Sequence, residues 1–245
     1  MPEITGTTPF VVDAPWKLLL PDGPAPASGW PLVVCLHGWG ENADHFARLC
    51  RPLVFAGAAF LFPQGPWSFE QRTMRSFEQQ TMGKIRIGHA WYLYDATDEP
   101  FRSTLGRAEG HLLGLLDTLI VEHPIDPARI ALLGFSQGAY TAYFIALRNT
   151  DRFRAMVALG GGRLKPEFVE DRLVNARRIP FLLLHGREDS SVPLERTELM
   201  RGELASRGFP VDLQAFSAGH EMTAEMLGAA SGWLARELGS IPSNA

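Results

Sequence analysis

Residues 129–138 read Arg-Ile-Ala-Leu-Leu-Gly-Phe-Ser-Gln-Gly, an apolar run that ends in the pattern Gly-x-Ser-x-Gly. The run over 129–133 predicts a buried strand, and residues 137–148 have the composition of a helix. A turn this tight between a strand and a helix strains the backbone at Ser136 and exposes its hydroxyl beyond the strand's carboxyl end. Glycines are needed at 134 and 138 because side chains there would collide with the turn. Ser136 is therefore the predicted nucleophile.

Short apolar runs alternate with helical segments on both sides of this stretch. The predicted strands are residues 31–37, 58–62, 129–133, 153–159, 179–185 and 211–216, and the predicted helices are residues 44–55, 105–121, 137–148, 194–206 and 221–238. The strands show little polar alternation, which is typical of strands covered on both faces. Alternating strands and helices imply crossover connections. We predict an α/β fold with a mostly parallel central sheet flanked by helices on both faces, and antiparallel edge strands within residues 10–20.

The length and charge of the chain limit the function classes. Its 245 residues, 46% of them hydrophobic, suit a single α/β domain, which we place over residues 1–245. The 23 basic and 27 acidic residues give a formal net charge of −4, so nucleic acid is not an expected partner. The longest apolar runs, such as residues 32–36, are far shorter than the roughly 20 residues of a membrane helix. No stable membrane insertion is expected.

The N-terminal residues and the cysteines indicate the cellular compartment in which the protein is expected. The N-terminus has neither the basic start nor the apolar core of a secretory signal. The two cysteines, Cys35 and Cys50, lack the density of a disulfide scaffold and the spacing of a zinc site. We predict reduced, buried thiols in a cytoplasmic protein, with a Cys35–Cys50 disulfide as the alternative.

Residues 63–103 show no clear helix or strand period. Loops this long are usually functional or disordered, and the many aromatic rings argue against disorder. We predict a long loop or partial lid over the active site, with Trp67, Trp91 and Tyr92 as candidate pocket residues. An ordinary surface insertion is the alternative. Four cations of this segment could bind an anionic group of a substrate, although solvated loop charges are the simpler interpretation: Arg72, Arg75, Lys84 and Arg86.

Two residues downstream of Ser136 are candidates for its general base. A serine hydroxyl needs an adjacent base that an acid orients, and in this architecture the acid and then the histidine follow the serine on loops after later strands. The downstream histidines are His185 and His220. Because His220 follows the last strand, we predict His220 as the base and Asp189 as the acid, with Glu188 as the alternative acid. His185 ends a strand and is expected to brace the loop that carries Asp189, here called the acid loop.

The developing oxyanion of acyl transfer also needs backbone donors. One is the amide after the nucleophile, that of Gln137, and the other comes from an earlier strand-to-helix loop. The glycines around Trp39 allow an unusual backbone path there, so the Trp39 amide is the second candidate. His37 in the same loop is expected to be a structural hydrogen bonder.

Four motifs together resemble the phospholipase/carboxylesterase family of α/β-hydrolases. They are Leu-His-Gly-Trp-Gly at 36–40, Gly-Phe-Ser-Gln-Gly at 134–138, His-Gly-Arg-Glu-Asp-Ser-Ser-Val-Pro at 185–193 and Gly-His at 219–220. The resemblance runs from about residue 31 to residue 238 and implies the α/β-hydrolase fold. It matches Ser136, Asp189 and His220 to the family's triad, and Trp39 and Gln137 to its oxyanion donors. Residue 39 is often small or aliphatic in the family, and residues 69–86 have no clear counterpart.

The expected function is therefore that of a serine hydrolase that cleaves carboxylic ester or thioester bonds through an acyl-enzyme intermediate. The family includes carboxylesterases and acyl-protein thioesterases, and it borders the dienelactone hydrolases, whose nucleophile is cysteine. The alternatives are a non-catalytic ligand-binding protein on the same fold and a prolyl-oligopeptidase-type peptidase. The sequence has no H-E-x-x-H, paired Cys-x-x-Cys or phosphate-loop motif, so no metal and no cofactor are expected. The expected partner is a small ester or thioester, and a homodimer is left open.

Overall fold

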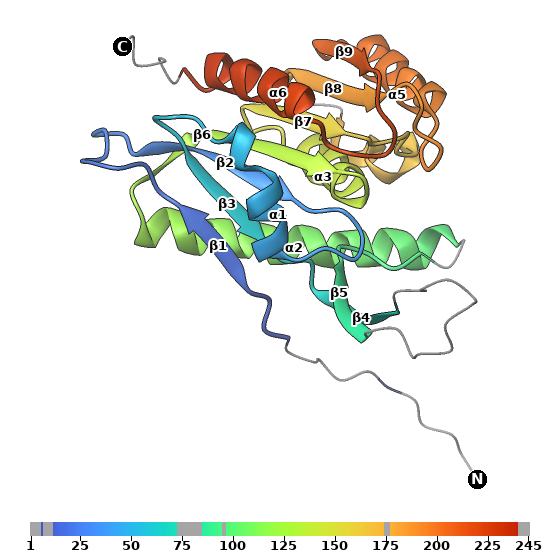
Figure 1. Ribbon diagram of the computed structural model, residues 1–245, viewed down its shortest axis with the longest axis horizontal. Helices are drawn as coiled ribbons and strands as arrows, with labels where there is room; N and C mark the ends of the chain where they lie inside the picture. Colours follow the sequence, from blue (N-terminus) through green and yellow to red (C-terminus); the bar gives the residue numbers. More distant parts are fainter. Residues whose placement is uncertain (1–5, 7–11, 73–84, 95–96, 174–176, 240–245) are drawn as a thin grey trace.

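The computed structural model describes residues 6, 12–72, 85–94, 97–173 and 177–239, and its centre is a seven-stranded sheet (Figure 1). The strand order is β1-β3-β2-β6-β7-β8-β9. Strand β1 runs antiparallel to β3, and the other neighbouring pairs are parallel, so the prediction of a mostly parallel sheet is confirmed. The bounds are Trp16–Leu19 (β1), Trp30–Leu36 (β2), Ala59–Pro63 (β3), Ile125–Phe135 (β6), Ala155–Leu159 (β7), Phe181–Gly186 (β8) and Val211–Phe216 (β9).

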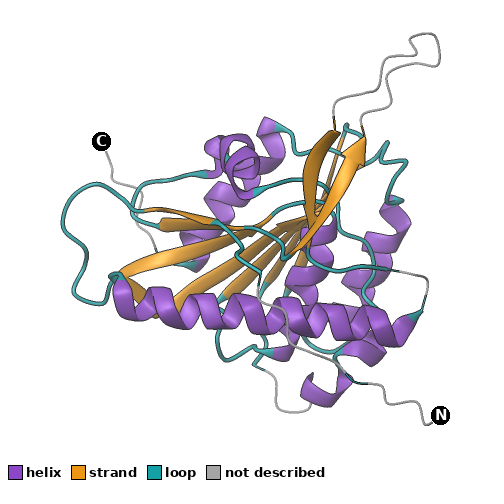
Figure 2. Cartoon of the chain, turned by 90° about the horizontal axis from the view of Figure 1, so that it is seen from below, coloured by secondary structure: helices purple, strands orange, loops and turns teal. Residues whose placement is uncertain are grey.

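Helices cover both faces of this sheet, which lies between them in Figure 2. Helices α2, α3 and α5 pack on one face, and α1 and α6 pack on the other. No helix in the described ranges has both the length and the apolar character needed to cross a bilayer. The helical bounds are Ala43–Leu49 (α1), Arg51–Leu53 (η1), Asp98–Glu122 (α2), Gln137–Arg148 (α3), Pro166–Phe168 (η2), Glu170–Leu173 (α4), Leu194–Ser206 (α5) and Ala224–Glu237 (α6).

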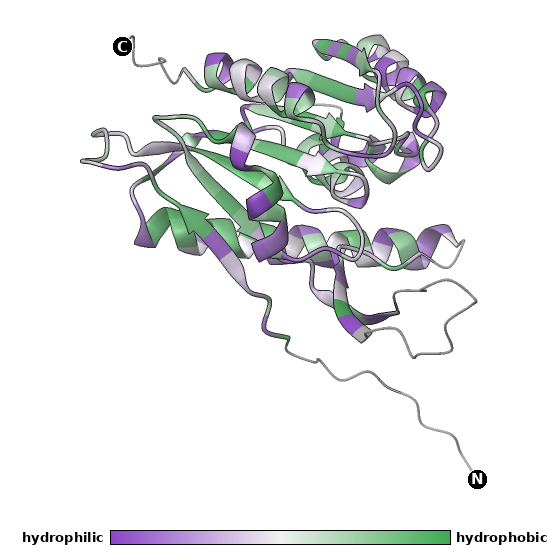
Figure 3. Cartoon of the chain, viewed as in Figure 1, coloured by the Kyte–Doolittle hydropathy of each residue, from purple (hydrophilic) through white to green (hydrophobic). Residues whose placement is uncertain are grey.

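Strand β2 shows why these sequences lack polar alternation. Leu32 and Val34 face the cluster under α2, α3 and α5, whereas Val33 and Cys35 face the cluster under α1 and α6. All four side chains are fully buried. Each large apolar side chain buried in this way stabilises the fold by roughly 1.5–3 kcal/mol. Both faces of the strand must therefore be apolar, and the central strands are the most hydrophobic part of the molecule (Figure 3).

Helix boundaries differ from the prediction where proline is present. Helix α2 begins at Asp98 rather than at residue 105, and Pro100 lies in its first turn, where the missing N–H costs nothing. The predicted helix 44–55 divides into α1 and η1, because Pro52 cannot continue an α-helical hydrogen-bond ladder. Of the predicted edge strands within residues 10–20, only β1 is present, and residues 10 and 11 lie outside the described ranges.

Segment 63–103 contains regular structure in place of a continuous loop. Strands β4 (Trp67–Arg72) and β5 (Ile85–Ala90) pair antiparallel and form a two-stranded ribbon apart from the main sheet (Figures 1 and 2). The first turns of α2 also fall within the segment. Two of its predicted anion-binding cations, Arg75 and Lys84, lie outside the described residues, as does the side chain of Arg72. Arg86, the fourth, donates to Gln71 Oε1 at 2.7 Å on the exposed side of the ribbon.

The two cysteines are free and buried, so the alternative of a disulfide is wrong. Cys35 lies in β2, and Cys50 follows α1. Burial raises the pKa of the Cys50 thiol to about 12, and burial also raises the pKa of Cys35. Both thiols therefore stay protonated at neutral pH and behave as small apolar side chains.

Candidate active site

Ser136 lies in the sharp turn between β6 and α3. Its φ of 52° is the only positive φ of a non-glycine residue in the described part of the chain. The flanking glycines are required: a Cβ at Gly134 would lie 2.3 Å from the Gly138 carbonyl oxygen, and one at Gly138 would lie 2.1 Å from that of Leu36. The Ser136 amide donates to Leu159 O at 2.9 Å and fixes the turn against β7. The strained serine is held by its surroundings.

The sheet brings Ser136, His220 and Asp189 together. The strands that precede them, β6, β9 and β8, are parallel, so their carboxyl ends meet at one edge of the sheet. His220 Nε2 lies 2.8 Å from Ser136 Oγ, and His220 Nδ1 lies 2.7 Å from Asp189 Oδ2. A carboxylate can only accept, so Nδ1 carries the ring proton and Nε2 can accept from the serine hydroxyl. The three side chains form one hydrogen-bonded line.

Asp189 is held in its ionised form. Its side chain is 1% exposed. Its Oδ1 accepts from the amides of Ser191 at 2.9 Å and Val192 at 2.8 Å. Burial alone would raise the pKa of Asp189, but the Val192 amide and the His220 ring outweigh it and lower that pKa below its usual value. The alternative acid, Glu188, is exposed to solvent.

His185 braces the acid loop, as expected from the sequence. Its Nε2 donates to the Val192 carbonyl at 2.8 Å, and its Nδ1 lies 2.9 Å from Thr197 Oγ1 on α5. The ring is fully buried, and its Nε2 lies 3.4 Å from Asp189 Oδ2. His185 thus joins the end of β8 to the loop and to the helix that follows it.

The predicted oxyanion donors lie on neighbouring elements. Trp39 follows β2, which pairs with β6, and Gln137 is the first residue of α3. Within the described residues, neither backbone amide has a hydrogen-bond partner, so both can donate to a ligand. The Gly40 amide donates to His89 O on β5 at 2.9 Å, which fixes the path of this loop.

His37 is a structural hydrogen bonder, as predicted. Its Nδ1–H donates to Gly38 O at 2.7 Å, and its Nε2 accepts from the Gly65 amide at 2.9 Å. The indole of Trp91 donates to the His37 carbonyl at 2.9 Å. Trp91 is fully buried and lies in the core, where it supports the loop after β2 that carries Trp39 (the candidate oxyanion loop).

Protonation of His37 should destabilise the fold in mild acid. Burial lowers its pKa to about 4, whereas an unfolded histidine has a pKa near 6.5. Below pH 6.5 the unfolded chain therefore binds a proton that the folded chain resists, and stability falls as the pH approaches 4, by about 3 kcal/mol for this group. His37→Gln should be less stable at pH 7, but its disadvantage should shrink between pH 7 and pH 4. Urea unfolding of both proteins across this range measures the difference between their free energies of unfolding. A difference that does not change with pH would contradict the lowered pKa of His37.

The side chain of Gln137 has a role that the sequence analysis missed. Its Oε1 accepts from the Trp91 amide at 2.9 Å, and its Nε2 donates to Tyr92 O at 3.0 Å. The residue beside Ser136 thus fixes the backbone that follows β5. The available signal was an amide side chain in the first turn of a largely apolar helix, where a buried polar group needs partners.

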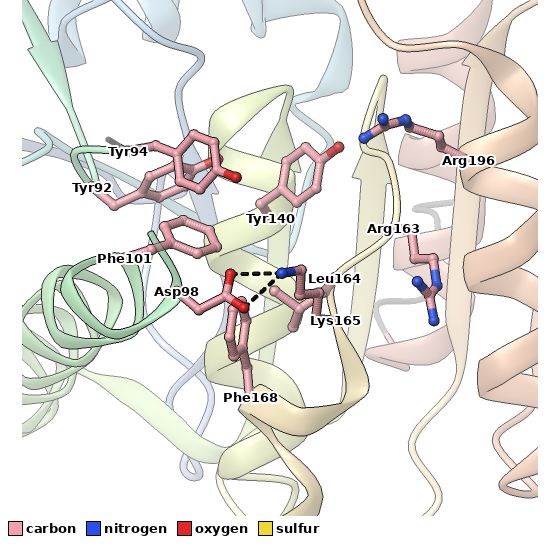
Figure 4. A pocket seen from close by; sticks show the side chains of 10 residues that line it. All are labelled: Tyr92, Tyr94, Asp98, Phe101, Tyr140, Arg163, Leu164, Lys165, Phe168 and Arg196. Atoms are coloured by element: carbon pink, nitrogen blue, oxygen red, sulfur yellow. Dashed lines mark hydrogen bonds and ion pairs between the residues drawn. The ribbon is translucent and has the colours of Figure 1, made fainter. Parts of the chain in front are cut away.

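Tyr92 and Tyr94 line two cavities, of which the larger reaches the candidate site. The larger, about 540 Å³, also includes Trp39 and Gln137 in its wall. The smaller, about 340 Å³, extends toward α5 (Figure 4). Among the predicted pocket residues, Tyr92 therefore faces cavity space. Trp67 is in the wall of neither cavity, and the guanidinium of Arg107 lies 5.8 Å from the centre of its ring.

The fold and the order of the site residues are those of the α/β-hydrolases: a serine in a sharp turn after a central strand, followed along the chain by an acid and a histidine after later strands. The model of the phospholipase/carboxylesterase family matches residues 27–237. The chain belongs to that family, which places it among hydrolases of the carboxylesterase and phospholipase type.

Individual relatives agree with this membership. Acyl-protein thioesterase 1 of Gibberella zeae is 29% identical over 122 residues, which are 48% of this chain and 52% of that protein, so the match spans about half of the relative. The crystal structure of esterase PE8 is 26% identical with a TM-score of 0.72, over 93% of this chain and 100% of that one. Acyl-protein thioesterase 2 of Zea mays shares the fold at 22% identity and a TM-score of 0.69, over 91% of this chain and 99% of its own.

Proposed function

We propose that this protein is a serine hydrolase that cleaves carboxylic ester bonds, and thioester bonds by the same chemistry. Ser136 is the nucleophile, His220 the general base and Asp189 the acid that orients it. The observation that carries the proposal is the hydrogen-bonded line from Ser136 Oγ through both ring nitrogens of His220 to a buried, ionised carboxylate.

The proposed reaction begins when His220 Nε2 takes the hydroxyl proton and Ser136 Oγ bonds to the carbonyl carbon of the substrate. The carbonyl oxygen becomes an oxyanion, to which the free amides of Trp39 and Gln137 donate. His220 then gives its proton to the departing alcohol or thiol as the carbon–oxygen or carbon–sulfur bond breaks. Water attacks the acyl-enzyme by the same steps and releases the acid. The sequence of steps requires no metal and no cofactor.

We also propose that residues 1–245 form a single domain in which segment 63–103 acts as a partial lid. The β4–β5 ribbon contacts the oxyanion loop through the hydrogen bond from Gly40 to His89. The exposed indole of Trp39 stacks on Phe69 of the same ribbon, with ring centres 4.6 Å apart. The ribbon is therefore placed to limit access to the larger cavity. The two free thiols support our expectation of a reducing, cytoplasmic location.

Covalent labelling tests the proposed function without knowledge of the natural substrate. A fluorophosphonate probe reacts with a serine that a base activates, so it should label the folded protein with one probe per chain. Peptide mass mapping should place the label on Ser136. The rate of p-nitrophenyl ester hydrolysis should fall in proportion to the fraction of chains that carry the label. Failure to label together with failure to hydrolyse short-chain esters would favour a non-catalytic binding protein.

A further inference from the structure

The smaller cavity, which shares Tyr92 and Tyr94 with the larger one, combines aromatic and cationic walls. Tyr92, Tyr94, Phe101 and Phe168 form its aromatic side, and Arg196 and Arg163 lie opposite (Figure 4). Lys165 lies on the aromatic side, beside Asp98 and near the ring of Phe168. Its volume of about 340 Å³ is suited to part of a small organic molecule. The aromatic side would accept a hydrocarbon chain, and the opposite side would attract a negative charge.

The charges of this cavity are not balanced. Its described wall has three cations and one carboxylate, Asp98, in a chain with a net charge of −4. Lys165 Nζ is held by both oxygens of Asp98, at 2.6 and 2.7 Å, and Arg163 is paired with Glu203 on α5. Among the described residues, no ion pair includes Arg196. Arg196 therefore carries the uncompensated charge.

Arg196 is directed toward a second polar group, the Tyr140 hydroxyl, and the two side chains point toward one another in Figure 4. Burial raises the pKa of the Tyr140 phenol, and the charge of Arg196 opposes part of that rise. The hydroxyl therefore stays protonated at neutral pH and can donate. A guanidinium beside a phenol hydroxyl presents several donors to one anion, an arrangement suited to a carboxylate.

This pair of groups lies close to the proposed nucleophile. Tyr140 is one helical turn after Ser136 on α3, and its amide lies 3.3 Å from the Ser136 carbonyl oxygen. The Tyr140 phenol is also near enough to Asp189 for that charge to raise its pKa. Arg196 is exposed and lies in the first turn of α5, and its neighbour Thr197 contacts His185 at the end of β8 at 2.9 Å. The backbone that carries this guanidinium is thus joined to the strand that precedes Asp189.

We propose that the cavity is a carboxylate subsite and that the preferred substrates are esters with a free carboxylate several bonds from the ester carbonyl. The carboxylate binds Arg196 and Tyr140, the hydrocarbon spacer packs on the aromatic side, and the ester group reaches Ser136. This inference rests on the proposed function, which it narrows to anionic esters.

Matched ester pairs test the subsite on the intact protein. The acyl-side pair is p-nitrophenyl hydrogen adipate and p-nitrophenyl hexanoate, which differ by a terminal carboxylate in place of a methyl group. The leaving-group pair is 4-carboxyphenyl acetate and 4-carbamoylphenyl acetate. The readout is the ratio of kcat/KM for the charged ester to that for the neutral one, after subtraction of spontaneous hydrolysis. One pair should show a ratio above unity, and the pair that does identifies the side of the ester that enters the cavity.

The variant Arg196→Gln should lower that ratio by about 10- to 100-fold, the range expected when a charged hydrogen bond is lost. Arg196→Lys, which keeps the charge but not the planar fork, should give an intermediate ratio. Arg201→Gln is the matched control, because it removes the same charge from α5 at an exposed position outside the cavity, and it should leave the ratio unchanged.

Two outcomes would overturn the subsite: ratios at or below unity in both pairs for the wild-type protein, or a ratio that Arg196→Gln and Arg196→Lys leave unchanged. The neutral esters separate this failure from failure of the proposed function. If the neutral esters are hydrolysed at Ser136 but the charged esters are not preferred over them, only the proposed carboxylate subsite is wrong. If neither class is hydrolysed, the proposed function is wrong as well.

Discussion

Ser136→Ala should lower kcat for ester hydrolysis by about 10⁶-fold, the scale of a triad nucleophile knockout. The loss is large because the hydroxyl is the attacking group, and no neighbouring side chain can replace it at the same point of the turn. The fold should be retained, since the described hydrogen bond of this hydroxyl is the one to His220. Initial rates with a p-nitrophenyl ester, together with circular dichroism and the melting temperature, measure the two effects separately.

Ser190→Ala is the matched control for this variant. Ser190 lies on the exposed part of the acid loop beside Asp189, so the same atom is removed near the site but away from the proton-transfer line. Its activity should stay within about twofold of wild type, as for most surface substitutions. Ser136→Ala protein that keeps more than one hundredth of the wild-type kcat would show that another group is the nucleophile.

Asp189→Asn should lower kcat by about 10⁴-fold, as expected when the acid of a triad is replaced by its amide. The surroundings of the carboxylate decide how the asparagine must lie. The amides of Ser191 and Val192 both donate to Oδ1, so the asparagine oxygen must occupy that position. Its NH₂ group then faces His220 Nδ1 and donates to it. The ring proton moves to Nε2, and the base can no longer accept from Ser136.

Glu188→Gln is the matched control, because it makes the same chemical change one residue earlier on an exposed side chain. It should retain near wild-type activity. A reversed pattern, with Glu188→Gln inactive and Asp189→Asn active, would identify Glu188 as the acid. Melting temperatures should accompany both rates, because Asp189 also fixes the acid loop through its two amide contacts.

The mostly parallel character of the main sheet could be predicted because its strands are covered on both faces. Continuous apolar runs such as that of β2 are typical of parallel strands that are buried on both faces of a sheet. Helices α3 and α5 were predicted at their observed bounds, and α5 has terminal signals in Pro193 before it and Gly208 after it. The β4–β5 ribbon was missed. Its strands mix aromatic, charged and glycine residues without strict alternation, and pairing between them depends on contacts that local sequence does not encode.

The proximity of Ser136, Asp189 and His220 could be predicted because the chemistry of acyl transfer limits both residue type and chain order. The roles that depend on tertiary contacts could not. Trp91 is an aromatic residue of a kind that often lines pockets, but it is buried and donates to the carbonyl of His37. Arg196 and Tyr140 come from separate helices, and nothing in the sequence indicates that they share a cavity. A residue's partners across the fold, rather than its type, decide such roles.

The hydrogen bonds of the Gln137 side chain have a consequence for how substrate preference can change. Both go to main-chain atoms, those of Trp91 and Tyr92, so they hold the course of the backbone whatever side chain stands at position 92. The lining at that position can therefore be exchanged by evolution, or by an engineer, while Ser136 keeps its place. Selectivity and reactivity are separable traits in this architecture.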